Sequence, residues 1–384
     1  MTAPSRLMMA ALAAISTNAL PHTSLASEAV EQIVVTGTRT PKTLEDSPVA
    51  IDIVTGEEIA QVTTGTLASA LAFIPGVVLT QNEKYGYTVM MQGFDSDRVL
   101  VLVDGMPLIS PTGESVDLDQ ISANDIERIE IVRGAASSLY GSSAMGGVIN
   151  IFTKQYQGNG LKAVAEYGRY NDYAINDDDT VTDYVVTGYT NIADWQVKLT
   201  GQRLDRPGYR YLTDGKIDDA AGVEKSFYSA QIRGELASIS VVYQPQYFEE
   251  SKVKAAGLLP DRSQDYYRSD VEQYQHDINF RGNSAWHLNT RLNHHDEISG
   301  RKTTKRSAKI DNTIIDGQKT WTQAALELVS GGKYAKQSIN QISLKDGSVE
   351  LDKSRHSTEL FTQADWQASD SLSLVAGFRG QHNS

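Results

Sequence analysis

Alternating apolar and polar residues fill the chain from about residue 161 to its end, and this pattern constrains the fold most. The alternation is found at residues 195–200, 228–236, 274–281, 286–295, 360–366 and 372–378. Successive side chains of a β-strand point to opposite faces, so each segment predicts a strand with one apolar and one polar face. The whole region predicts roughly 11 such strands.

The predicted links between these strands alternate in length. Short links are expected at 191–194, 237, 282–285, 330–333 and 368–371, and long links at 171–180, 205–225, 248–271, 295–320 and 345–357. Such alternation places all long links on one side of the sheet, which is typical of an antiparallel transmembrane β-barrel with short periplasmic turns. A soluble β-sandwich has the same alternation within its strands, so the link lengths carry this inference. Interface girdles are expected from aromatic residues near the strand ends, among them Tyr167, Tyr189, Trp195, Trp286 and Trp366.

The N-terminus resembles a secretory signal peptide. Arg6 precedes an apolar run at residues 7–15, and small and polar residues follow as far as Ser27. Residues 1–26 are therefore predicted to be a signal peptide, cleaved after Ala26 or after Ala19. The alternative is an amphipathic starter helix of a cytosolic protein. No later segment has the ~20 apolar residues of a membrane helix, so an exported chain of this kind is periplasmic, secreted or an outer-membrane barrel.

Composition excludes several classes of function. The chain has 35 Lys and Arg against 48 Asp and Glu, a net charge of −13, which would repel the phosphates of a nucleic acid. It has no cysteine, and therefore no disulfide, no thiolate zinc site and no cysteine nucleophile. The sequence also lacks a nucleophile elbow, a metal-binding motif and a Walker motif. We therefore expect neither an enzyme nor a metal site, and we assign no catalytic residue or cofactor.

Residues 41–154 mix short strands with short helices and glycine turns, which predicts a compact α+β domain. Strands are expected at 99–103, 129–132 and 148–152. The segment 67–73 predicts a short helix closed by Pro75-Gly76, and Ser122 is a plausible N-cap for a second one.

Three stretches resemble the TonB-dependent outer-membrane transporters: EQIVVT at 31–36, TVMMQGFDSDRVLVLVDGMP at 88–107, and IERIEIVRGAASSLYGSSAMGGVINIFTK at 126–154. The resemblance implies a TonB box and linker at 27–40, a plug domain at 41–154 and part of a β-barrel at 155–384. Family barrels have about 22 strands, so we expect a fragment with roughly half a barrel that cannot transport alone. The partner implied is TonB with its inner-membrane complex, contacted through Glu31, Gln32, Ile33, Val34, Val35 and Thr36.

A physical reading of the TonB-box segment agrees with this role. The β-branched residues 33–36 can add as a strand to the edge of a partner sheet. The alternative is an ordinary first strand of the domain.

The resemblance also implies three plug loops that face outward, at about 81–87, 95–98 and 107–113. The predicted ligand contacts in these loops are Tyr85, Tyr87, Asp95, Arg98, Pro107 and Leu108. Aromatic rings and a cation suit an anionic, aromatic-rich iron chelate. The alternative is that these are solvated loop residues.

Two positions depart from the family pattern. Gln92-Gly93 stands where the family has Arg-Gly, and Ala135 stands where it commonly has proline. Arg133, with Glu130, is left as the candidate lock between plug and barrel.

The resulting hypothesis is an outer-membrane receptor for energy-coupled uptake of a scarce ligand, most simply a ferric siderophore. Cobalamin and haem receptors share the plug pattern and remain alternatives, as does, from another class, a passive porin or structural barrel. We expect the barrel to contact outer-membrane lipid, and colicins or phages to be further partners. Ca²⁺ at the acidic loops 176–179 and 214–219 is less favoured than simple solvation. His294 and His295 should point to opposite faces of a strand, so they cannot jointly bind one haem iron, although ligation by a single histidine stays open.

Overall fold

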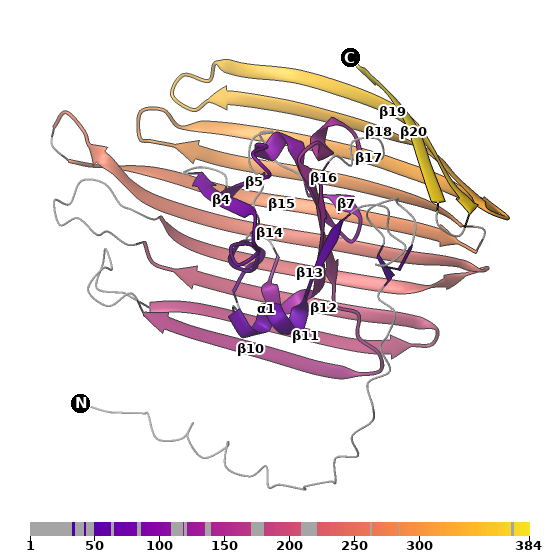
Figure 1. The fold of residues 1–384 in the computed structure, drawn as a ribbon. Helices are drawn as coiled ribbons and strands as arrows, with labels where there is room; N and C mark the ends of the chain where they lie inside the picture. Colours follow the sequence, from indigo (N-terminus) through magenta and orange to yellow (C-terminus); the bar gives the residue numbers. More distant parts are fainter. Residues whose placement is uncertain are drawn as a thin grey trace, which may run out of the picture.

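The computed structural model consists of an N-terminal domain lying against one face of a broad, curved β-sheet, which we call the wall (Figure 1). The described residues are 33–34, 42–43, 50–62, 65–82, 86–108, 118, 121–134, 140–169, 180–208, 221–261, 263–283, 285–369 and 372–384. The predicted signal peptide lies outside them, as do the acidic loops 176–179 and 214–219. An α+β domain followed by a run of antiparallel strands is confirmed.

The centre of the N-terminal domain is a five-stranded sheet. Its strands are β3 (Ile51–Thr55), β8 (Ile126–Arg133), β9 (Gly147–Thr153), β6 (Val99–Val103) and β7 (Met106–Pro107), in that order, with only β9 and β6 parallel. Around it lie α1 (Gly56–Val62), α2 (Leu67–Leu71), the hairpin β4 (Val77–Asn82) and β5 (Gly86–Met91), and the 3-10 turns Ser96–Arg98, Ala123–Asp125 and Ser142–Ala144. The predicted strands at 99–103, 129–132 and 148–152 and the predicted helix at 67–73 are all present.

Turn chemistry and apolar packing account for this domain. Asp104 and Gly105 both have positive φ, at 49° and 82°, which is the backbone of a tight hairpin turn, and they join β6 to β7. The Ser122 hydroxyl accepts a hydrogen bond from Asn124 N at 3.3 Å, so it caps a helix as predicted, but a 3-10 turn and not an α-helix. The core is built from α2 and the central strands, with Leu67, Leu71, Val99, Ile129, Ile131, Ile149 and Ile151 all nearly inaccessible to solvent.

The wall has 11 strands, each antiparallel to its neighbour and in sequence order from β10 to β20. They are β10 (Gly160–Arg169), β11 (Thr180–Ile192), β12 (Trp195–Arg206), β13 (Gly222–Leu236), β14 (Ile239–Leu258), β15 (Gln264–Gly282), β16 (Trp286–Gly300), β17 (Arg306–Gln323), β18 (Leu326–Ser343), β19 (Val349–Ser369) and β20 (Leu372–Asn383). The predicted strand number is therefore confirmed for the described part of the chain.

The wall is apolar outside and polar inside, the reverse of a soluble sheet. Buried side chains on the face toward the N-terminal domain include Gln202, Gln231, Gln244, Gln273, Gln275, Asn293, Asn312, Gln318 and Gln363. The alternate residues face away and are exposed although large and apolar, among them Tyr184, Leu199, Tyr228, Leu292, Ile315, Leu360 and Phe378. This distribution is that of strands with lipid on one side and polar groups on the other.

Several predicted links are wrong. Residues 248–271, 295–320 and 345–357 were expected to be long loops, but β14 to β19 run through most of them and leave links only at 259–263, 301–305 and 344–348. Residues 330–333, expected to be a turn, lie inside β18; the turn is at Ala324, which has φ 52°. The misread segments are rich in charged and hydroxyl side chains, yet their backbones pair in continuous ladders. The asymmetry between the two ends persists, because the other links are tight turns such as 193–194 and 324–325.

Two short strands precede the N-terminal domain. β1 (Ile33–Val34) pairs antiparallel with β2 (Lys42–Thr43) in a sheet of their own. Among the described residues, no helix has the length and apolar character needed to cross a membrane.

Candidate functional site: the seam between the N-terminal domain and the wall

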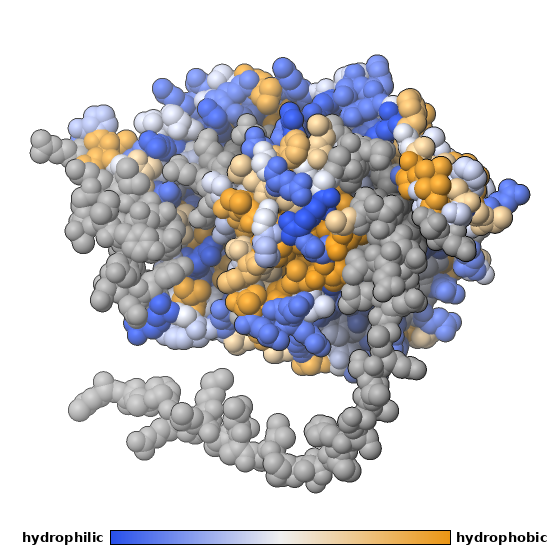
Figure 2. All heavy atoms as spheres, in the orientation of Figure 1, coloured by the Kyte–Doolittle hydropathy of each residue, from blue (hydrophilic) through white to orange (hydrophobic). Residues whose placement is uncertain are grey.

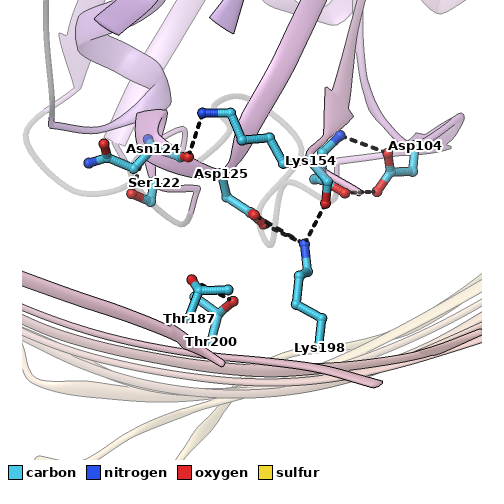
Figure 3. Close-up of polar contacts among 9 residues, drawn as sticks. Asp104, Ser122, Asn124, Asp125, Lys154, Thr187, Lys198 and Thr200 are labelled. Atoms are coloured by element: carbon cyan, nitrogen blue, oxygen red, sulfur yellow. Dashed lines mark hydrogen bonds and ion pairs between the residues drawn. The ribbon is translucent and has the colours of Figure 1, made fainter. Parts of the chain in front are cut away.

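The seam is centred on an ion pair between Asp125 and Lys198. Asp125 ends the 3-10 turn that Ser122 caps, and its carboxylate points toward the wall (Figure 3). Lys198 rises from β12, close to the tight turn at 193–194, and its Nζ lies 3.0 Å from both carboxylate oxygens. The same Nζ donates to the carbonyl oxygen of Lys154 at 3.2 Å. One cation of the wall therefore joins two separate segments of the N-terminal domain.

This ion pair is shielded from water. The side chain of Lys198 is 7% exposed and that of Asp125 is 16% exposed. Burial raises the pKa of the Asp125 carboxyl above its usual range, and the attraction of Lys198 opposes that shift. A buried pair of this kind adds little net stability, but removing one partner leaves an uncompensated charge and is costly. Loss of either charge alone should therefore loosen the contact.

Lys154 and Asp104 fix the chain beside the ion pair. Lys154 Nζ donates to the carbonyl oxygen of Asn124 at 3.0 Å, and burial lowers the pKa of this lysine. Asp104 accepts hydrogen bonds from the backbone N and the hydroxyl of Thr153, at 3.0 and 2.8 Å (Figure 3). These bonds fix Thr153 and Lys154, where the chain leaves the domain on its way to the wall.

A second polar contact is made by Arg291 of β16. Its guanidinium is 2% exposed and binds Asp277 of β15 through two hydrogen bonds of 2.6 Å each. Its remaining nitrogen donates to the carbonyl oxygen of Pro107 in β7. The planar, five-donor guanidinium can satisfy a carboxylate and a backbone carbonyl together, which an ammonium on a flexible stem does less well.

Apolar packing supplies a third contact. Leu102, Val132 and Val148 of the N-terminal domain share a buried cluster with Val329 and Phe361 of the wall. Near this cluster, a Cβ at Gly141 would lie 3.2 Å from the guanidinium of Arg379, which pairs with Glu359 on the wall. The N-terminal domain therefore touches the wall at several separate places. Figure 2 shows apolar residues gathered over this domain, with hydrophilic residues toward the rim.

A cavity of about 40 Å³ lies within the seam, between the Asp125 and Arg291 contacts. Met106, Leu108 and Ile121 line it from the N-terminal domain; Thr200, Phe227, Ser229, Gln244, Gln246, Gln275 and Asn279 line it from the wall. It has room for a few water molecules at about 10–15 Å³ each, and the amide groups offer them partners. A seam with ordered water exchanges hydrogen bonds with little loss when it opens.

The predicted ligand contacts are scattered. Tyr85 lies outside the described residues, and Tyr87 is half-buried against the core of the N-terminal domain. Asp95 is exposed, and Arg98 is exposed with Nε 3.9 Å from Asp97. Pro107 and Leu108 lie at the seam, where they meet Arg291 and the cavity. The structure does not gather these six residues into one described site, and their role in ligand binding stays a prediction.

The predicted lock residues make their described contacts inside the N-terminal domain. Arg133 donates to Asp52 Oδ2 at 2.5 Å and to the carbonyl oxygen of Pro75 at 2.8 Å. Glu130 is fully buried and accepts from Arg128 Nε at 2.8 Å. Their function as a lock stays a prediction.

Lys198 and Arg291, which do bridge the seam, were missed by the sequence reasoning. Each is a cation on the inward, polar face of an alternating strand, and a buried cation requires a partner. That signal could have identified both residues, although not Asp125 or Pro107 as their partners.

Of the predicted TonB contacts, Ile33 and Val34 are described and pair with Thr43 and Lys42. Glu31, Gln32, Val35 and Thr36 lie outside the described residues. The β-strand conformation agrees with both readings of this segment.

Comparison with known proteins identifies the N-terminal domain. A family model described as the TonB-dependent Receptor Plug Domain matches residues 43–148. Residues 43–148 form a domain of the TonB-dependent receptor plug type. Over 138 residues it is 41% identical to the Vitamin B12 transporter BtuB of Vibrio cholerae serotype O1, an alignment covering 35% of this chain and 23% of that protein. The matched part is therefore less than a quarter of that relative's length.

Solved structures extend the likeness from the plug to the wall. The ferric enterobactin receptor PfeA of Pseudomonas aeruginosa, in complex with enterobactin, superposes with a TM-score of 0.70 over 87% of this chain and 58% of that one, at 16% identity. The FpvAI–pyocin S2 complex gives a TM-score of 0.68 over 91% of this chain and 52% of that one, at 13% identity. At such identities the likeness is one of fold: a plug seated against a curved antiparallel wall.

Proposed function

We propose that this chain is part of an outer-membrane receptor that imports a scarce ligand by TonB-dependent displacement of its plug. One observation carries the proposal. The plug lies against the polar face of a wall whose opposite face is apolar, and many of the contacts between plug and wall are hydrogen bonds and ion pairs. Ion pairs and hydrogen bonds at the seam can be exchanged for contacts with water when the plug moves, whereas a wholly apolar interface would expose its surface at a cost of ~25 cal/mol per Å².

Rows of aromatic residues support a place in the outer membrane. All four tryptophans lie near the tight-turn ends of wall strands: Trp195 and Trp286 begin β12 and β16, and Trp321 and Trp366 come close to the ends of β17 and β19. Toward the opposite end, Tyr228, Tyr247 and Tyr274 stand side by side on the outer face, with centroid distances of 6.3 and 4.9 Å.

The separation of these rows matches the thickness of a membrane. Tyr274 pairs with His294, eight positions after Trp286 on β16, which is about 27 Å along a strand. A tilt of about 40° reduces this to roughly 20 Å, comparable with the ~25 Å apolar band of outer-membrane barrels.

Energy would enter through the segment Glu31–Thr36. Strand addition to the edge of a TonB sheet provides main-chain hydrogen bonds along which a pull can be transmitted. The pull would reach the plug through β3 and separate Asp125 from Lys198. No covalent step is involved, since the work is conformational and its energy comes from the inner-membrane complex.

For the ligand, two candidates have support. Cobalamin is favoured by the 41% identity of the plug to a vitamin B12 transporter and by the chemistry of the wall. Four cations of the wall, Lys198, Lys225, Arg291 and Arg379, are paired with carboxylates, and much of the remaining inner face is Gln and Asn. Such a surface suits a ligand rich in neutral amides better than a multiply charged anion.

A ferric siderophore is the second candidate. The aromatic and cationic residues of the plug loops favour it, and the ferric enterobactin receptor shares the fold. The likeness to the FpvAI–pyocin S2 complex extends the proposal to colicin-like proteins that would use the same receptor for entry.

The test is uptake by cells that lack their own receptors for both ligands. Cells expressing the whole receptor of which this chain is part should accumulate labelled cyanocobalamin, and deletion of Glu31–Thr36 should abolish accumulation at unchanged surface level. Accumulation of ferric enterobactin in place of cobalamin would transfer the proposal to the second ligand. Uptake that survives the deletion would refute energised import and indicate a passive porin.

A further inference from the structure

The inner face of β16 carries a buried pair of metal-ligating side chains that the proposed uptake mechanism does not use. His295 is 3% exposed and Glu297 is 2% exposed, and both point inward because they are two positions apart in one strand. His294, the adjacent residue, points outward, where its side chain is 43% exposed and bonded to Asp311 at 2.6 Å. The two adjacent histidines therefore lie in different environments.

One nitrogen of His295 is fixed and the other is available. Its Nδ1 lies 3.2 Å from Oε1 of Gln273, the residue directly opposite on β15. A carbonyl-type oxygen can only accept, so Nδ1 carries the proton and Nε2 presents its lone pair. Nε2 has no hydrogen-bond partner although it is buried. An imidazole held through one nitrogen, with the other open, is arranged as metal-binding histidines are.

Glu297 supplies the complementary oxygen. Its Oε2 lies 3.7 Å from Nε2 of His295, too far for a hydrogen bond, and its Oε1 also lacks a partner. Leaving such groups buried and unpaired costs about 1–3 kcal/mol each, and more for a charge. Both groups offer lone pairs, and a cation between them would satisfy both.

The spacing suits a transition-metal ion. Tetrahedral coordination with bonds of ~2.0–2.1 Å places two ligand atoms roughly 3.4 Å apart, so a small side-chain rotation closes the observed gap. Ala308 and Ile310 are the β17 residues opposite Glu297 and His295, and both are buried, so this side of the pair is apolar. Imidazole with carboxylate is a ligand set for Zn²⁺ and its neighbours, not for Ca²⁺.

We propose that His295 and Glu297 bind one divalent transition-metal ion of the zinc class on the inner wall, with Gln273 orienting the imidazole. Among the described residues no group of three or more His, Cys, Asp and Glu side chains is placed to hold a metal. The site therefore offers two protein ligands and leaves the other positions to water or to a ligand in transit, as exchangeable rather than structural sites do.

This proposal is independent of the proposed uptake function, because metal binding to the purified protein can be measured without TonB and without transport. The purified protein in detergent micelles, stripped with a chelator, would be titrated with Zn²⁺ against a chromophoric competitor. We expect one zinc per chain. His295→Gln and the isosteric Glu297→Gln should each lower the affinity at least tenfold. Gln273→Leu, which removes only the orienting acceptor, should lower it about 10- to 100-fold.

His294→Gln is the matched control, since it changes the same residue type one position away on the opposite face; it should bind zinc as the parent does. Circular dichroism and heat-modifiable migration would establish that each variant is folded. The competing explanation is a protonated His295 forming an ion pair with Glu297, which needs no metal. Absence of zinc binding by the parent, or equal loss in His294→Gln and His295→Gln, would overturn the proposal.

Discussion

Replacing Lys198 by methionine should loosen the plug from the wall. Methionine keeps the length of the side chain and removes the charge, leaving the Asp125 carboxylate beside the seam without its cation. Breaking a buried pair in this way costs about 3–5 kcal/mol. Protonation of Asp125 limits the cost, since neutralising a carboxyl of ordinary pKa at pH 7 takes roughly 1.4 kcal/mol for each of about three pH units. Protonation thus caps the cost at about 4 kcal/mol, and we expect the lower end of the range, about 3 kcal/mol.

The assay uses the absence of cysteine from the chain. Thr200→Cys introduces a single thiol at a wall position that is 5% exposed and lines the seam cavity. Its labelling rate by a water-soluble maleimide reports how often the seam opens, provided that closing is faster than labelling. At tenfold per 1.4 kcal/mol, 3 kcal/mol predicts labelling about 150-fold faster in the Lys198→Met background.

Two controls separate the ion pair from general damage. The double variant Lys198→Met/Asp125→Asn removes both charges and should return labelling to within about tenfold of the parent. Lys225→Met removes a buried cation within the wall, where it pairs with Glu250 at 2.7 Å; Glu250 keeps its second partner Lys252, also at 2.7 Å, and labelling should be unchanged. Equal rates in Lys198→Met and the parent would show that this pair does not hold the plug.

Three further outcomes are expected. Burial raises the pKa of Asp125, so its attraction to Lys198 should weaken as the pH falls through that raised pKa and the carboxyl becomes neutral. The neutral carboxyl is itself favoured in the folded state, so the rest of the plug should not be destabilised by this protonation. The double-mutant cycle of Lys198→Met and Asp125→Asn, measured at pH 7 and pH 5, checks this. Leu199→Arg, midway along the outward face of β12 and 56% exposed, should cost about 2–4 kcal/mol in refolding into lipid vesicles. Gly147→Ala should destabilise the plug and lower its thermal midpoint, because φ is 135° and the new Cβ would clash with the backbone carbonyl oxygen of Val132.

The sequence predicted elements wherever one local property decides them. The run 99–103 is apolar throughout and ends in a turn that requires positive φ, so it was placed correctly as β6. The long strands were misplaced because alternation weakens beyond the tyrosine row, where charged residues and Ser occupy both faces of β14 and β15. There the hydrogen bonds between the backbones of neighbouring strands determine the structure, and this pairing places few demands on the types of residue. The partners Asp125 and Lys198 lie 73 positions apart and meet only through the docking of two domains.

The continuation of β14 to β19 as paired strands beyond the aromatic rows limits how the wall can change in sequence. A single inserted residue in a ladder turns every following side chain to the opposite face, so insertions there would exchange the inward and outward surfaces. The inner surface of the wall can then change mainly by substitution at alternate positions of its strands. Changes to the inner surface of the wall should thus be found as point substitutions at inward-facing positions and not as insertions within the ladders.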